Sequence, residues 1–140
     1  MCYNNAYAGD GTNNAIVLGE GHVSWNLSHW RAAFEAAYIR YLNPAAADLA
    51  ASFGYYLEAG YDVASLFQAS FSLIPFLRWT HYNTAFETAA GKDVTHNIKQ
   101  LMAGICFLPI PHISVKADYT YEWTFSGNSS VINLGVGYDF

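Results

Sequence analysis

The chain has 140 residues, of which 53% are hydrophobic, 17% aromatic and only 12% charged. About a quarter of the residues in an average soluble domain are charged, so this chain carries half the usual solvating charge. Six Lys and Arg against eleven Asp and Glu give a net charge of −5 without a basic run, which argues against nucleic-acid binding. The high aromatic content excludes a disordered chain, and the length predicts one domain over residues 1–140.

Transmembrane helices are also excluded, because they need about 20 consecutive apolar residues. The longest nearly uncharged run, 63–77, is interrupted by three serines, a glutamine and a proline. Met1–Tyr7 has neither the basic region nor the apolar region of a secretory signal peptide. We therefore expect either a mature sequence or a fragment of a longer one.

Apolar and polar residues alternate with a period of two along most of the chain, which predicts β-strands with two different faces. The expected strands cover 15–27, 30–42, 53–63, 71–82, 95–107, 112–125 and 132–140, with a short additional strand at Cys2–Tyr7. Most are 10–14 residues long, whereas an ordinary strand has about 5–6 and a tilted membrane-crossing strand about 9–11. Strand length therefore favours a membrane protein. Two alanine-rich segments, Ala32–Tyr41 and Ala45–Ala51, have a local helical alternative, weaker for the first.

The strand at 112–125 shows the alternation most clearly. Its polar face carries His112, Ser114, Lys116, Asp118, Thr120 and Glu122. Its other face carries Ile113, Val115, Ala117, Tyr119, Tyr121 and Trp123. Successive strand residues point to opposite faces, so this strand predicts an interface between water and an apolar medium.

The polar faces supply the predicted lining of an aqueous pore. These residues are Glu20, His22, Arg31, Glu35, Glu58, Asp62, Arg78, Lys116, Asp118, Glu122 and Asp139. Seven acids against three Arg and Lys leave the face net negative, and acidic rings favour cations. The alternative is purely structural pairing across strands, Lys116 with Asp118 or Glu58 with Arg78.

Aromatic residues on or near the apolar face form a predicted lipid-facing girdle. They are Trp25, Trp30, Tyr61, Trp79, Tyr119, Tyr121, Trp123, Tyr138 and Phe140. Amphipathic rings favour the headgroup region of a bilayer. The alternative is that these rings form the core of a soluble β-sandwich.

The connections alternate in length. Short turns are expected near Leu27–His29, Leu66–Ser70 and Leu108–Pro111, and longer loops at Asn43–Ser52, Thr84–Asp93 and Phe125–Ser130, with a fourth at Ala8–Asn14. Outer-membrane barrels have short periplasmic turns and longer extracellular loops.

Enzymatic chemistry and cofactors are not expected. The five histidines are scattered over separate strands and loops, whereas a zinc site needs three or four converging ligands. No G-x-S-x-G nucleophile motif is present. Cys2 and Cys106 are too few for a disulfide framework, although a single bridge between them stays open, and Cys106 is expected to pack as a small hydrophobe.

Several segments together resemble the C-terminal part of the phosphate-selective porin O/P family. They are YYLEAGYDV (Tyr55–Val63), IPFLRWTHYNT (Ile74–Thr84), VTHNIKQLMAGICFLPIPHISVKADYTYEW (Val94–Trp123) and INLGVGYDF (Ile132–Phe140). The resemblance implies a barrel in the outer membrane of a Gram-negative bacterium, with about 16 strands and trimeric assembly in the family. This chain has fewer than half of those strands. Phosphate selectivity rests on Arg and Lys ladders in that family, and the acidic face here does not support it.

The sequence thus predicts an all-β, antiparallel up-and-down meander of about seven or eight long strands, forming part or all of a transmembrane β-barrel. The predicted function is passive diffusion of small hydrophilic solutes or ions through a water-filled lumen, with the lipid bilayer as partner. An eight-stranded barrel would be filled by its own side chains. A barrel without a pore, serving as a membrane anchor or a lipocalin-like carrier, is therefore the main alternative, and a membrane enzyme is a third.

Overall fold

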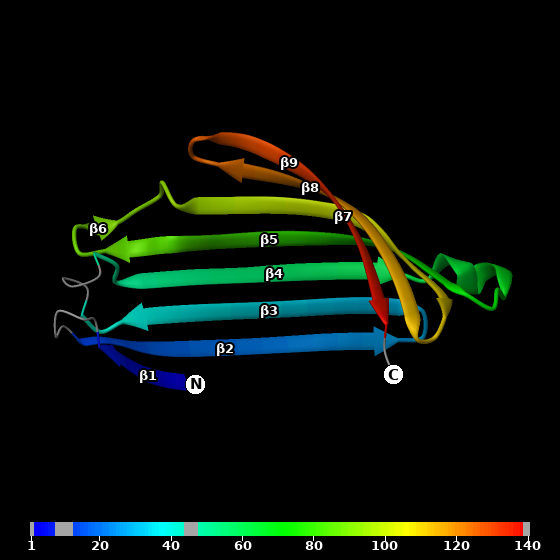
Figure 1. Cartoon of the computed structure of the whole chain (residues 1–140), viewed down its shortest axis with the longest axis horizontal. Helices are drawn as coiled ribbons and strands as arrows, with labels where there is room; N and C mark the ends of the chain where they lie inside the picture. Colours follow the sequence, from blue (N-terminus) through cyan, green and yellow to red (C-terminus); the bar gives the residue numbers. More distant parts are fainter. Residues whose placement is uncertain (1, 8–12, 44–47, 139–140) are drawn as a thin grey trace.

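A computed structural model of the chain describes the backbone of residues 2–7, 13–43 and 48–138, and the side chains from residue 15 onwards within these ranges. Eight antiparallel strands form one sheet in the order β1-β2-β3-β4-β5-β7-β8-β9, and β6 pairs only with β5 (Figure 1). The strands are β1 (Cys2–Tyr7), β2 (Asn13–Leu27), β3 (Trp30–Tyr41), β4 (Ala51–Tyr61), β5 (Ser72–Thr88), β6 (Gly91–Lys92), β7 (Asn97–Ile110), β8 (Ile113–Thr124) and β9 (Gly127–Tyr138). The predicted all-β antiparallel meander of about seven or eight strands is confirmed, and the possible short strand at Cys2–Tyr7 is one of the eight.

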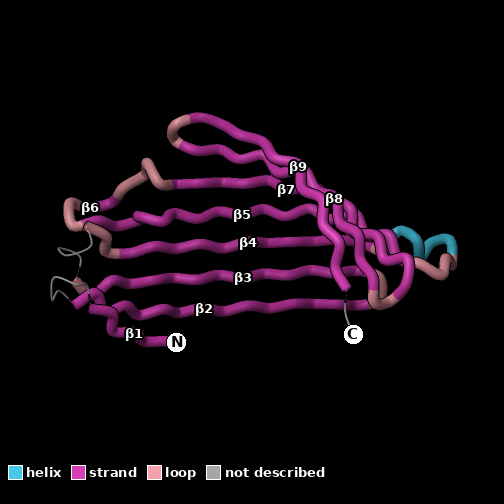
Figure 2. The backbone as a smooth tube through the Cα atoms, viewed as in Figure 1, coloured by secondary structure: helices cyan, strands magenta, loops and turns pink. Residues whose placement is uncertain are grey.

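The sheet is curved but not closed. Strands β2 to β5 form a nearly flat wall, and β7, β8 and β9 curl over it, so that the sheet has a concave side, here called the trough (Figure 2). Its edges are β1 and β9. Because β1 pairs with β2 only between Asn13 and Leu18, the rest of β2 is also an open edge.

The alanine-rich segment Ala32–Tyr41 is a strand and not a helix. It lies within β3, which pairs along its length with β2 on one side and with β4 on the other. Alanine favours helices only weakly, and pairing with two neighbouring strands overrides that preference. The second alanine-rich segment, Ala45–Ala51, falls partly outside the described residues; its last residue, Ala51, begins β4.

The connection between β4 and β5 is longer than the sequence predicted. The expected strand at 53–63 ends at Tyr61, and the expected short turn is replaced by a 3-10 helix, η1 (Val63–Phe67). Asp62 caps the N-terminus of η1 by accepting a hydrogen bond from the Ala64 amide, and Gln68 ends it in the left-handed conformation. An Asp followed by small residues is a helix-start signal, which the alternation of the preceding strand concealed.

Two predicted long loops are also wrong. The expected loop at 125–130 is a two-residue turn, Phe125–Ser126, because Gly127 adopts a φ of 146° and lets β9 start at once. The expected loop at 84–93 is mostly strand, since β5 extends to Thr88 and forms a small hairpin with β6. The loop between β3 and β4 is long as predicted, whereas residues 8–12 lie outside the described residues. The regular alternation of short turns and long loops is therefore not observed.

The sheet has little hydrophobic core. Only Ala15, Ala50, Ala51, Ala64 and Ile74 are buried apolar residues, and no large side chain within the described ranges is fully buried. The accessible surface is 9249 Å², whereas a compact soluble monomer of this mass, 15.5 kDa, exposes about 7,200 Å². Many large apolar side chains are exposed, among them Ile132, Leu134 and Val136. No helix in the described part of the chain is long and apolar enough to cross a membrane.

Candidate functional site

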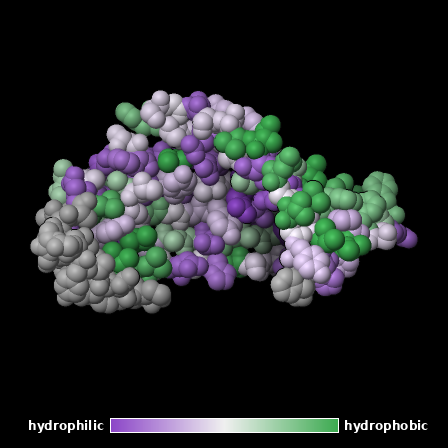
Figure 3. Space-filling model, viewed as in Figure 1, coloured by the Kyte–Doolittle hydropathy of each residue, from purple (hydrophilic) through white to green (hydrophobic). Residues whose placement is uncertain are grey.

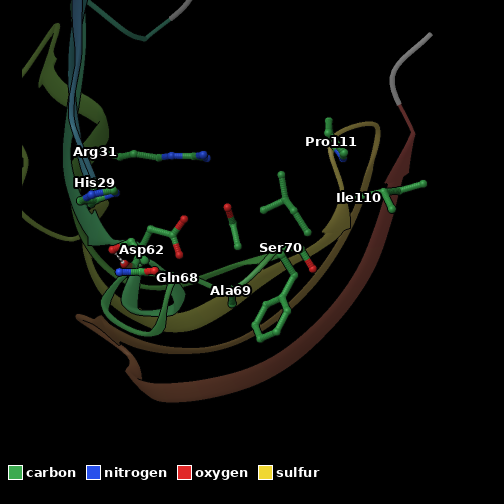
Figure 4. A pocket seen from close by; sticks show the side chains of 12 residues that line it. His29, Arg31, Asp62, Gln68, Ala69, Ser70, Ile110 and Pro111 are labelled. Carbon is green, nitrogen blue, oxygen red and sulfur yellow. Dashed lines mark hydrogen bonds between the residues drawn. The ribbon is translucent and has the colours of Figure 1, made fainter.

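The polar face of the sheet is the concave face, which lines the trough. The strand registers place Arg31 opposite Gly60, Glu58 opposite Arg78, and Gln100 opposite Glu122, so these side chains share one face. Arg31 projects into the trough (Figure 4). The face of the molecule in Figure 3 is hollowed at its centre, and hydrophilic residues gather around the hollow.

Charges at the middle of the trough are paired, Glu58 with Arg78 across β4 and β5 and Lys116 with Asp118 along β8. The Arg78 guanidinium donates to Glu58 Oε2 through Nε at 2.7 Å, its NH2 nitrogen lies 2.6 Å from the same oxygen, and its carbon lies 4.7 Å above the Tyr56 ring. Lys116 Nζ is 3.7 Å from Asp118 Oδ2 and 4.6 Å from the centre of the Phe76 ring. Both ion pairs that the sequence offered as a structural alternative are thus formed, but only Glu58–Arg78 joins two strands, because Lys116 and Asp118 both lie on β8. Paired charges on a half-exposed face still present polar atoms to water, so pairing does not exclude a lining role.

Two acids of the trough are held by neutral donors. Asp118, only 8% exposed, accepts a hydrogen bond from Asn133 Nδ2 at 2.9 Å. Glu122 accepts bonds from Gln100 Nε2 at 2.7 Å and from Ser129 Oγ at 3.4 Å. These bonds connect β7, β8 and β9, and they leave the negative charge of Glu122 without a basic partner among the described residues.

The remaining predicted lining residues lie toward the margins. Glu20 and His22 are exposed on the part of β2 that does not pair with β1, and His22 Nδ1 lies 3.3 Å from Glu20 Oε1. Glu35 faces the trough from β3, opposite Tyr56. Asp139, a predicted lining residue, and Phe140, a predicted girdle residue, lie outside the described residues.

Asp62 does not line the trough as part of a strand. It lies where β4 runs into η1, at one end of the trough, and borders an open cleft of about 590 Å³ together with His29, Arg31 and Gln68 (Figure 4). Desolvation opposes ionisation of Asp62, but hydrogen bonds from Ser72 and from the Leu73 and Ala64 amides, with the charge of Arg31, keep its pKa below the usual value. The carboxylate therefore holds the β4–β5 connection to the sheet, and its structural role is better supported than the predicted lining role.

The opposite, convex face exposes the apolar residues. Leu134, Val136, Ile132 and Tyr138 on β9 are 81%, 78%, 74% and 68% exposed. Leu57, Leu77, Ile105 and Tyr119 are exposed on the inner strands, where the registers place them on the same face. An exposed apolar surface that continues across many strands marks a contact with lipid or with another protein.

The predicted girdle residues lie mostly at two ends of this convex face. Trp25, Trp30 and Tyr61 lie near the β2–β3 turn, where the Trp30 and Tyr61 rings pack edge to face at 4.9 Å. Trp79, Tyr121 and Trp123 lie toward the other end, with ring centres 5.9 Å apart for the two tryptophans and 4.8 Å apart for Tyr121 and Trp123. Tyr138 ends β9 opposite Ile113, and Tyr119 lies between the two ends.

A polar border on the convex face was missed by the sequence analysis. Near the end of β5, His81 Nε2 lies 2.6 Å from Asn97 Oδ1, and the buried Asn83 donates to the Asp93 carbonyl at 2.8 Å. Arg40 and Glu87 form an ion pair at the same end. The sequence contains one sign of this border. In β3, β5 and β7, polar residues occupy a few positions that the alternation assigns to the apolar face, and these positions lie toward the same end of the sheet.

No group of three or more His, Cys, Asp or Glu able to hold a metal lies within the described part of the chain. Cys106 is unpaired and half-buried on the trough face, opposite Lys116.

Comparisons with known proteins found no match: no family model fits the sequence, and no curated protein and no solved structure is significantly similar to it. The resemblance to phosphate-selective porins therefore stays a prediction from the motifs alone.

Proposed function

We propose that the chain is part of the wall of an outer-membrane β-barrel, through whose water-filled lumen small hydrophilic solutes or ions diffuse. The observation that carries this proposal is the direction of the two faces. The apolar side chains lie on the convex face and the charged and amide side chains line the trough. A soluble domain or a lipocalin-like carrier would need the reverse arrangement, with apolar side chains enclosed.

The height of the apolar surface supports the proposal. On β8 the convex face is apolar or aromatic at every position from Ile113 to Trp123. Ten residue steps of about 3.4 Å, tilted by about 35–45°, project to about 24–28 Å along the membrane normal, which is close to the roughly 25 Å apolar band of such barrels. One strand therefore has the length needed to cross the apolar core.

The open edges of the sheet require further strands to complete the barrel. Unpaired backbone N–H and C=O groups cannot remain in contact with lipid, and β9 has one unpaired side along its whole length. Further strands must pair with β9 and with β1 and β2 to close the wall.

Acidic side chains of the trough indicate a preference for cations. Among the described lining residues, with Asp62 left out because it caps η1, five acids face three Arg and Lys. Two of the acids are compensated by Arg78 and Lys116, while Glu122 has only neutral partners. Acidic groups that line a pore attract cations and repel anions.

Planar-bilayer recording of the full chain, refolded into lipid, tests the proposal. We expect discrete conductance steps and a reversal potential that shows cation preference. Insertion has to be established in the same preparation by protection of the strands from protease. A chain that inserts and stays silent would contradict the pore and favour a non-conducting membrane anchor, whereas a chain that stays monomeric in water without detergent would contradict the membrane location.

A further inference from the structure

We propose that a cleft on the convex face, between the start of β7 and the end of β8, binds the anionic phosphate headgroup of a membrane lipid. This inference rests on the proposed function, since it needs the convex face to contact a bilayer. The cleft has a volume of about 240 Å³ and is lined by Val94, Asn97, Lys99, Trp123, Thr124 and Phe125.

The cleft lies at the border between the apolar surface and the polar end of the strands. In the register across the sheet, His81, Lys99 and Trp123 occupy neighbouring positions of one row. The next row toward the β2–β3 turn holds Trp79, Leu101 and Tyr121. A ligand in the cleft would therefore have its polar part beside Lys99 and its apolar part over aromatic and aliphatic side chains.

Two hydrogen-bond donors at the cleft are unused. Lys99 is exposed and forms no ion pair, hydrogen bond or ring contact within the described ranges. Asn97 Oδ1 lies 2.6 Å from His81 Nε2. The side-chain nitrogen of Asn97, Nδ2, therefore points away from that bond and has no partner among the described residues. An ammonium group beside an amide N–H₂ matches the acceptor oxygens of a phosphate.

On the convex face itself, Lys99 gives the cleft a positive charge. The convex positions of β7, β8 and β9 between residues 97 and 138 carry no acidic residue, and Glu122 lies on the opposite face. Of the two acids that adjoin lining residues in the sequence, Glu122 lies on the trough face, and Asp93 accepts hydrogen bonds from the Thr95 hydroxyl and amide and lies 3.2 Å from His96. Lys99 is thus the only formal charge on this part of the face, and a lysine at a bilayer border extends its ammonium group to the headgroups.

The walls of the cleft fit a lipid better than a free ion. Trp123 is 36% exposed, Phe125 71% and Val94 67%. Inorganic phosphate gains nothing from apolar walls, whereas the glycerol and upper acyl carbons of a lipid bury them and are already held at this depth. We therefore assign the site to a lipid-borne phosphate.

Quenching of Trp123 by brominated lipids tests the assignment. A full-length variant with Trp25, Trp30 and Trp79 changed to Phe retains Trp123 as its only tryptophan, and its fold is checked by circular dichroism. In vesicles, we expect brominated phosphatidylglycerol to quench Trp123 with a relative binding constant about fivefold above that of brominated phosphatidylcholine, the ratio that one lysine at an anionic surface supplies. Lys99→Gln should bring the two lipids to parity.

Lys92→Gln is the matched control, because Lys92 is another exposed lysine but lies on β6, over the Phe86 ring; it should leave the preference unchanged. Equal quenching by both lipids, or a preference that survives Lys99→Gln, would overturn the assignment while leaving the membrane location intact. No quenching by either lipid would overturn the proposed function itself. A preference that disappears on adding inorganic phosphate, at matched ionic strength, would assign the cleft to the free ion.

Discussion

Replacing Leu134 by arginine tests whether the convex face contacts lipid. Leu134 is 81% exposed on β9 and lies four residues from Tyr138. We take Tyr138, a girdle residue, as the edge of the apolar band. Four residue steps of about 3.4 Å along a strand tilted by about 40° then place Leu134 about 10 Å inside the band, close to the middle of its roughly 25 Å height. Arginine at that depth destabilises a membrane barrel by about 2–4 kcal/mol. A substitution at an exposed position of a soluble protein, in contrast, changes the free energy of folding by about 0.5 kcal/mol or less.

The neighbouring residue supplies the control. Asn133 faces the trough, where its amide donates to Asp118, and an arginine there can still pair with that carboxylate. We expect Asn133→Arg to cost less than about 1 kcal/mol. The assay is the free energy of folding into vesicles, from reversible urea titrations. Equal, small effects at both positions would refute the two-faced membrane orientation.

Three further predictions concern the trough and its end. Gly104→Ala should destabilise the fold by about 1–3 kcal/mol, because a Cβ there would lie 2.6 Å from the Phe76 ring and 2.7 Å from the Ala117 carbonyl; Gly135→Ala, with nothing within 4 Å, should be nearly neutral in the same urea titration. Glu122→Gln should lower the ratio of cation to anion permeability in reversal-potential measurements, since it removes a charge without a basic partner, and an unchanged ratio would contradict a lining role. Because the pKa of Asp62 is lowered in the folded state, the stability it contributes is present above its unfolded pKa of about 3.9 and lost as the pH falls through its folded pKa. Wild type should therefore lose stability relative to Asp62→Asn on acidification below about pH 4, and parallel pH profiles of the two proteins would contradict this role.

The sequence alone determined the strands and their faces. In β8, alternation of Lys116, Asp118 and Glu122 with Ala117, Tyr119 and Tyr121 placed each group on one face, because side chains of a strand alternate with an invariant period of two. The same reasoning anticipated the pairs Glu58–Arg78 and Lys116–Asp118. The faces and the Lys116–Asp118 pair are local properties of one strand, and the Glu58–Arg78 pair joins two strands that follow each other in the chain.

Only the tertiary structure decided the rest. Whether the polar face is concave depends on the direction in which the whole sheet curls, which no single strand encodes. The helix after Asp62 and the tight turn before Gly127 depend on a cap that reaches Leu73 across the connection and on a φ of 146°, and hydropathy patterns report neither. The polar border and the cleft beside Lys99 arise because β5, β7 and β8 align their ends, and that alignment exists only once long-range pairing has set the registers.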